Sequence, residues 1–114
     1  MKKTCDLSER ECIPCKGGVP PLPPPQQQEL LKQLPEGWSV VAEHHLEKTF
    51  HFTDFQQALA FTNLAGQIAE NQNHHPEITL TWGLVTIRIW THKIDGLTES
   101  DFILAAKIEA ATQA

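Results

Sequence analysis

Two short segments in the second half of the chain alternate apolar and polar residues, which is the pattern of half-buried β-strands. They span residues 78–82 and 85–91, and the intervening Gly83-Leu84 suits a two-residue type II′ turn with glycine first. Because a two-residue turn fixes the register of a hairpin, the apolar side chains should share one face. This apolar face comprises Ile78, Leu80, Trp82, Val85, Ile87 and Ile89.

The same register predicts what lies on the polar side of this hairpin. It sets Glu77 opposite Trp90 and His75 opposite His92, so two imidazoles should meet there. Trp82 falls on the apolar side, which predicts a packing role in the core for its indole. Trp90 shares the polar side with His92.

Residues 53–73 carry the periodicity of an α-helix. Thr53-Asp54-Phe55-Gln56 has the form of a capping box, and two apolar stripes along the segment predict heavy burial. Pro76 disfavours helical backbone before it, so the helix should end near Asn73 or His74. Glu70 and His74 are four residues apart and should share a face, where Glu70 either holds His74 or solvates the helix end.

Two more strands precede this helix. They span residues 38–42 and 45–52, with a turn through Glu43-His44, and the second strand carries Lys48 on its otherwise apolar side.

A final helix begins at Thr98-Glu99-Ser100-Asp101, which has capping-box form with an acid at the third helical position, and runs to near the C-terminus. With a short N-terminal helix around residues 27–33, the order of the main elements is β-β-α-β-β-α. The sequence therefore predicts an α+β fold in which helices pack on one face of a four-stranded antiparallel sheet.

Length and charge restrict the class of protein. The chain has 114 residues, of which 40% are hydrophobic, and this is enough for one domain with one modest core. A net charge of −5 supplies no basic field for nucleic acid or an anionic membrane, and no apolar run approaches the roughly 20 residues needed to span a bilayer. The start of the chain lacks the apolar stretch of a secretory signal. We expect a cytoplasmic protein.

Residues 1–25 differ in composition from the domain predicted at residues 26–114. Proline and glycine exclude regular structure there, so we expect a mobile arm. It contains Cys5, Cys12 and Cys15. Cys12 and Cys15 have half the spacing of a zinc knuckle, but a structural site needs four ligands and few others are available. We expect reduced thiols and no metal, and an odd number of cysteines argues against a disulfide framework.

Three histidines are the candidate chemical groups. Imidazole donates and accepts protons near pH 7, and His74, His75 and His92 are brought together by one helix end and one strand. The remaining histidines, His44, His45 and His51, are expected to be ordinary surface or packed side chains.

These residues also carry a family resemblance. The run Glu70-x-x-x-His74-His75-Pro76-Glu77, the aromatic Trp82, Thr91-His92 and Gly96-Leu97-Thr98-Glu99-x-Asp101 resemble the signature of the pterin-4a-carbinolamine dehydratases. The likeness extends from Leu30 to the C-terminus, and residues 12–22 resemble the start of many bacterial members. It implies homodimers joined at sheet edges, or tetramers. It also implies a lyase that dehydrates 4a-hydroxytetrahydropterin to quinonoid dihydropterin, in tetrahydrobiopterin-type recycling, without metal or organic cofactor.

Roles follow from this resemblance and from the chemistry. We assign His74 and His92 as the acid/base pair and His75 as the group that orients the pterin or its leaving hydroxyl. The residues expected to bind or support the pterin are Glu70, Pro76, Glu77, Trp90 and Asp101. Asp101 either orients His92 or only caps its helix. The alternative function is that of a non-catalytic binding or assembly factor, whose mark would be loss of the histidines.

We predict that deletion of residues 1–25 leaves the dehydration rate nearly intact, because no acid/base candidate lies in this segment. Its composition also predicts that it buries little surface. The measurement is turnover by the truncated chain, together with metal analysis of the full chain. Loss of turnover, or stoichiometric zinc that depends on Cys12 and Cys15, would make the segment a structural or functional element.

Overall fold

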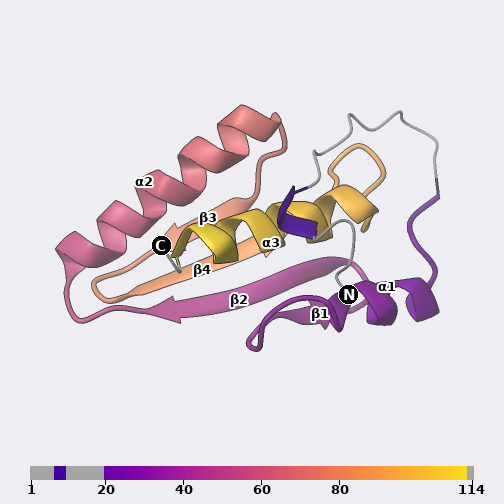
Figure 1. The fold of residues 1–114 in the computed structure, drawn as a ribbon, viewed down its shortest axis with the longest axis horizontal. Helices are drawn as coiled ribbons and strands as arrows, with labels where there is room; N and C mark the ends of the chain where they lie inside the picture. Colours follow the sequence, from indigo (N-terminus) through magenta and orange to yellow (C-terminus); the bar gives the residue numbers. More distant parts are fainter. Residues whose placement is uncertain (1–6, 10–19, 113–114) are drawn as a thin grey trace.

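The computed structural model describes residues 7–9 and 20–112 and has the predicted α+β architecture (Figure 1). Its strands form one antiparallel sheet in the spatial order β1-β2-β4-β3. The strands are β1 (Ser39–Val41), β2 (His45–His51), β3 (Glu77–Leu80) and β4 (Leu84–Ile89), and the helices are α1 (Pro24–Leu31), α2 (Phe55–Gln72) and α3 (Glu99–Thr112), preceded by a 3-10 turn, η1 (Leu7–Glu9). The predicted order β-β-α-β-β-α is confirmed.

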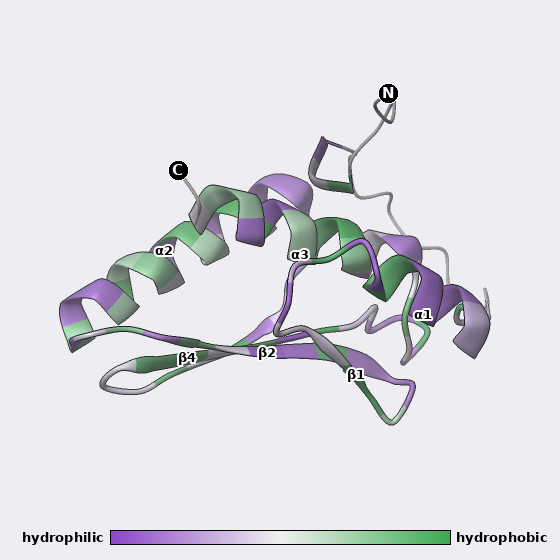
Figure 2. Cartoon of the chain, turned by 60° about the horizontal axis from the view of Figure 1, so that its bottom comes forward, coloured by the Kyte–Doolittle hydropathy of each residue, from purple (hydrophilic) through white to green (hydrophobic). Residues whose placement is uncertain are grey.

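Helices α2 and α3 cover one face of the sheet, and the other face is left uncovered by the described chain (Figure 2). The core lies between these layers, where Leu46, Val85, Ile87 and Ile89 of the sheet are fully buried. Helix α3 is buried along most of its length, because it packs on both the sheet and α2.

The predicted register of the β3–β4 hairpin is wrong by two residues. Leu80 pairs with Val85 and Ile78 with Ile87, and the turn is centred on Trp82-Gly83 instead of Gly83-Leu84. A shift of two residues leaves the side chains of the paired residues on their predicted faces, since side chains alternate with a period of two. The apolar and polar faces are therefore as expected, although the individual pairs are not.

This register moves Trp82 out of the core. It lies in the turn and 67% of its surface is exposed, so the predicted packing role is wrong. The backbone explains the choice of turn, because the amide of Phe52 donates to the carbonyl of Gly83 at 2.8 Å and a Cβ on Gly83 would lie 3.0 Å from the carbonyl oxygen of Phe52. The close approach of the backbone just after β2 leaves little room for a side chain and favours glycine at this position.

Helix α2 begins one residue later than the predicted capping box implied. The cap is Asp54, whose side chain accepts from the amide of Gln57 at 2.8 Å.

The burial of α2 is also less than predicted, because only one face of the helix contacts the sheet and α3. The outward stripe is partly exposed at Phe55, Leu59 and Leu64, by 44%, 40% and 41%.

Parts of the N-terminal segment pack against the domain. Leu7 is part of the core and only 3% exposed, and the carbonyl of the next residue, Ser8, accepts from Nζ of Lys107. Further along, the amide of Leu22 donates to the carbonyl of Leu97. Helix α1 begins at Pro24, before the expected start near Gln27. The expectation that the segment buries little is therefore wrong at Leu7, and deletion of residues 1–25 should lower the free energy of unfolding even if turnover is kept.

The expectation on the cysteines of this segment lies outside what the structure describes. Cys5, Cys12 and Cys15 fall outside the described residues, so the expected state of their thiols stays a prediction. Among the described residues, no helix is long and apolar enough to cross a membrane.

Lys48, on the apolar side of β2, is explained by a partner on α3. Its Nζ donates to Oε1 of Glu109 at 2.6 Å, and the indole N–H of Trp38 donates to the same oxygen at 2.9 Å. The side chains of Lys48 and Glu109 are 15% and 7% exposed. These bonds join β2 of the sheet to α3. The two buried charges are tolerated because each is paired with the other.

We predict that Lys48→Met lowers the free energy of unfolding by about 3 kcal/mol, because it leaves the Glu109 carboxylate buried without its cation. The matched control is Lys32→Met, which removes a lysine whose pair with Glu29 is 75% and 73% exposed and should cost less than about 1 kcal/mol. Denaturant unfolding at one protein concentration measures both. Equal stability of the two variants would contradict the role of the buried pair.

Candidate active site

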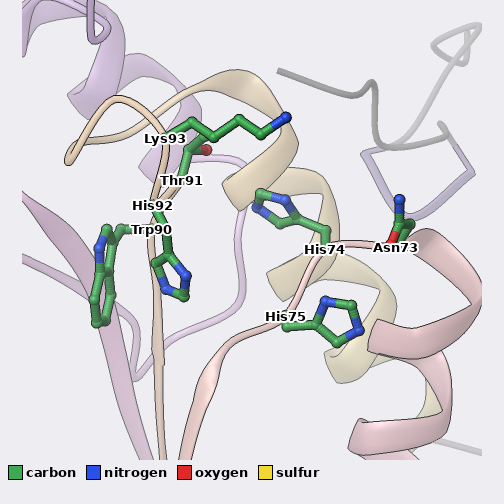
Figure 3. Close-up of a pocket in the computed structure, with 7 residues that line it drawn as sticks. All are labelled: Asn73, His74, His75, Trp90, Thr91, His92 and Lys93. Atoms are coloured by element: carbon green, nitrogen blue, oxygen red, sulfur yellow. The ribbon is translucent and has the colours of Figure 1, made fainter. Parts of the chain in front are cut away.

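The predicted histidines meet in a cavity of about 240 Å³ between the end of α2 and the end of β4. The lining residues are Asn73, His74, His75, Trp90, Thr91, His92 and Lys93. Figure 3 shows the imidazoles of His74 and His92 in the space between the two segments and Lys93 along one side, whereas the ring of His75 extends from its backbone toward α2, away from His92. Three groups that can donate or accept a proton therefore share one small pocket.

The end of α2 sets the directions of His74 and His75. Asn73 caps the helix in the left-handed conformation, with φ of 53° and ψ of 42°, and the amide of His74 donates back to the carbonyl of Ala69 at 3.1 Å. Pro76 then keeps the chain extended as it enters β3. Both histidines are thus fixed in the short turn between a helix and a strand.

His74 is anchored by a buried carboxylate. Its Nε2 lies 2.6 Å from Oδ1 of Asp101, a residue with no exposed surface. Because an ionised carboxylate only accepts, Nε2–H of His74 donates, which leaves Nδ1 as the nitrogen free to exchange a proton in the neutral ring. The partner of His74 is Asp101 and not Glu70, contrary to one of the two expectations for Glu70.

Asp101 also caps the helix that carries it. Its Oδ2 accepts from the amide of Thr98 at 2.8 Å and from the hydroxyl of Thr91 at 2.9 Å. Of the two bonds in the predicted capping box, the one from the Thr98 amide to the Asp101 carboxylate is confirmed. The Thr98 hydroxyl, which would make the other bond, lies instead 3.0 Å from the hydroxyl of Thr91. Asp101 therefore combines helix capping with the orientation of a histidine, but that histidine is His74 and not His92.

His75 has a looser anchor at the protein surface. Its Nε2 lies 2.9 Å from Oε1 of Glu70, and the two side chains are 55% and 74% exposed. Continuing the observed register beyond the strands sets His75 opposite Trp90 and not opposite His92. An exposed pair of this kind contributes little to stability, so His75 can change partners when a ligand enters.

His92 lies at the start of a tight loop after β4. The loop is closed by paired backbone bonds between Thr91 and Gly96, at 2.8 and 3.4 Å. The ring of His92 packs on the indole of Trp90, with centroids 4.6 Å apart. Among the described residues its ring makes no hydrogen bond, which leaves both nitrogens for a ligand.

Not every predicted residue reaches the cavity. Pro76 and Glu77 do not line it, and Glu77 instead faces Arg88 across the β3–β4 ladder. Asn73, Thr91 and Lys93 line it although the sequence argument gave them no role. The signal for Asn73 was its suitability for a left-handed helix cap shortly before a proline; no pattern marked Lys93.

The described residues do not gather into a metal site. Within residues 7–9 and 20–112, no group of three or more histidine, cysteine, aspartate or glutamate side chains could hold a metal ion. The donors that are present are used in pairs, as His74 with Asp101 and His75 with Glu70. The arrangement suits proton transfer to and from a bound organic molecule.

Comparison with known proteins places this chain in a family. The family model described as pterin 4 alpha carbinolamine dehydratase matches residues 20–111. The chain belongs to this family. The sequence-based identification of a dehydratase of this kind is thereby confirmed.

Relatives named among the pterin-4-alpha-carbinolamine dehydratases match over nearly their whole length. A protein of Rubrobacter xylanophilus is 57% identical over 104 residues, which cover 91% of this chain and 96% of the relative. One of Rickettsia bellii is 52% identical over 109 residues, covering 96% of each.

Solved structures with the same fold come from proteins with different descriptions. A transcriptional coactivator/pterin dehydratase of Brucella melitensis has a TM-score of 0.74 at 33% identity, over 79% of this chain and 96% of that one. A pterin dehydratase-like protein identified as a RuBisCO assembly factor in the α-carboxysome has a TM-score of 0.56 at 25% identity, over 66% and 88%.

We predict that Asp101→Asn lowers activity by about 10²-fold while reducing the free energy of unfolding by only about 1–2 kcal/mol. The two oxygens of Asp101 accept from three donors, whereas an amide has only one acceptor oxygen. When that oxygen takes the place of Oδ2 and keeps the bonds from Thr91 and Thr98, the bond that orients His74 is lost. The control is Asp54→Asn, the same change at the cap of α2, where asparagine caps equally well. Full activity in Asp101→Asn would show that His74 does not need this carboxylate.

Proposed function

We propose that this protein dehydrates 4a-hydroxytetrahydropterin to quinonoid dihydropterin by histidine acid/base catalysis. The observation that carries the proposal is the convergence of His74, His75 and His92 on one cavity in a member of this family. A volume of about 240 Å³ is suited to a small bicyclic ring system rather than to a macromolecule.

The reaction needs two proton transfers and no change of oxidation state. The bond between the carbinolamine carbon and its hydroxyl oxygen breaks, and a double bond forms from that carbon to the adjacent ring nitrogen. An acid protonates the leaving oxygen, which departs as water, and a base removes the proton of the ring nitrogen. Each positioned transfer typically contributes roughly 10²–10⁴-fold to a rate.

His74 suits the role of the base. Its Nε2–H is committed to Asp101, and the buried carboxylate stabilises the imidazolium that forms when Nδ1 takes a proton. One ring nitrogen thus holds the orienting carboxylate and the other accepts the proton, as in other histidine bases that are oriented by an aspartate.

His92 suits the role of the acid at the leaving hydroxyl. Its ring nitrogens have no hydrogen-bond partner among the described residues, and its position is set by Trp90. His75 is exposed and bonded to Glu70, which fits orientation of the pterin more than proton transfer. The opposite assignment of acid and base to His74 and His92 uses the same geometry.

The substrate, location and oligomeric state that we propose are those expected from the sequence. The substrate is a tetrahydrobiopterin-type pterin that needs recycling, and the protein acts in the cytoplasm without metal or organic cofactor. We propose homodimers or homotetramers, since the short outer strands β1 and β3 leave the sheet open at its edges.

The alternative is a binding or assembly factor on the same fold. The structural neighbour described as a RuBisCO assembly factor shows that one such description exists for a pterin dehydratase-like protein. The catalytic proposal is preferred for this chain because all three histidines are retained and two of them have carboxylate partners.

We predict that His74→Ala or His92→Ala lowers the catalysed rate by roughly 10²-fold or more, because each removes one proton transfer from the transition state. His75→Ala should act mainly on KM. Rates are measured by stopped flow with synthetic 4a-hydroxytetrahydropterin, after subtraction of the uncatalysed reaction. A double variant should lose less than the product of the single losses if the two histidines act together.

The control for these variants is His51→Ala, which removes an exposed histidine of β2 away from the cavity. Circular dichroism and oligomer mass report whether each variant keeps its fold. If folded His74→Ala and His92→Ala both keep nearly full activity, the acid/base assignment is wrong and the binding-factor alternative becomes the better account.

A further inference from the structure

Trp90 lies between the cavity and a second group of histidines. Its indole contacts the ring of His92 at a centroid distance of 4.6 Å and also contacts His44 at 5.2 Å and His45 at 5.8 Å. Continuing the β2–β4 register by one pair sets His45 opposite Trp90. The histidines at the β1–β2 turn therefore reach His92 through one shared aromatic side chain.

His44 is also bonded to the loop that carries His92. Its Nε2 lies 2.7 Å from Oδ1 of Asp95, so Nε2–H donates to the carboxylate. Asp95 follows His92 by three residues, and its amide donates to the carbonyl of His92 at 3.3 Å. A movement of Asp95 is thus transmitted to the backbone of His92.

Backbone in the left-handed region, which most side chains disfavour, lies just before His44 and at Asp95. Ala42 and Glu43, just before His44, have φ values of 54° and 56°, and Asp95 has a φ of 52°. Such residues persist only where the surrounding structure holds them, and they gather at functional sites. One support is visible at the turn, where Nε2 of the buried Gln27 donates to the carbonyl of Glu43 at 3.2 Å.

The ring of His44 is held from its other side as well. Its Nδ1 lies 3.0 Å from Nδ1 of His45, whose Nε2 lies 3.4 Å from Oε1 of Glu47. The same oxygen accepts from Nε of Arg88 at 3.0 Å. A continuous series of contacts therefore runs over the uncovered face of the sheet to His44, and it fixes the ring that holds Asp95.

We propose that His44 is a positioning residue for His92, acting through its bond to Asp95 and its contact with Trp90. His44 does not line the cavity, so it has no direct contact to offer a ligand there. Its effect is to keep the loop 92–95 and the Trp90 indole in the arrangement that directs His92 toward the pterin. This inference rests on the proposed function only in assigning His92 a part in catalysis.

The test uses His44→Ala, Asp95→Gly and the double variant. Glycine suits the positive φ of residue 95, so this change removes the acceptor without adding strain. Each single variant should lower kcat by about 3- to 5-fold, with KM within about twofold of the unaltered protein, since a pair whose side chains are 31% and 84% exposed has a modest effect. The double variant should be no slower than the slower single variant, because both changes break the same link.

Two controls separate positioning from general damage. Asp95→Asn keeps an acceptor oxygen and tolerates a left-handed backbone, so it should recover most of kcat. His51→Ala changes an exposed histidine away from Trp90. The imidazole NMR signals of His92 should move or broaden in His44→Ala and Asp95→Gly, and stay in place in both controls.

Each outcome bears on one proposal. If His92→Ala is inactive while His44→Ala keeps full kcat and unmoved His92 signals, the positioning role is wrong and the proposed function stands. A rise of KM alone in His44→Ala would also overturn the positioning role, because it would make His44 a ligand-binding residue. If His92→Ala is itself fully active, the acid/base assignment of the proposed function fails, whatever the signals of His92 show.

Discussion

One buried carboxylate holds together the parts of the molecule from which the site is made. Asp101 receives hydrogen bonds from the end of α2 through His74, from the end of β4 through Thr91, and from the start of its own helix through Thr98. A charge without exposed surface is costly unless its oxygens are fully used. Three donors on two oxygens meet this requirement, so the joining of the segments and the orientation of His74 have the same cause.

The sequence was sufficient for the elements and for the faces of the sheet. Alternation in residues 78–91 predicted which side chains point to the core, and this prediction held for the paired residues of β3 and β4 although the register was displaced by two residues. The displacement depended on a contact that is remote in sequence, the bond from Phe52 to Gly83, which no local turn preference contains. For the same reason Trp82 was wrongly placed in the core.

The arrangement around the histidines was predicted only in part. The motif brought His74, His75 and His92 together, but neither alternative for Glu70 or Asp101 paired the carboxylate with the histidine that it contacts, because spacing along a helix cannot tell which residue lies behind the helix end. Asp101 comes from α3, 27 residues after His74. A turn between β1 and β2 was predicted, but the left-handed backbone of Ala42 and Glu43 had no signal, since neither residue is typical of positive φ. Its conformation is imposed by tertiary contacts.

The brevity of the segments that carry the histidines has a consequence for binding. His74 and His75 lie within three residues of the end of α2 and within three residues of the start of β3, and His92 is three residues beyond β4. Little chain is left to be ordered by a ligand, so the entropy of arranging the site is spent when the protein folds and not when pterin arrives. A preorganised pocket of this kind should bind and release a small ligand without a slow rearrangement of these segments.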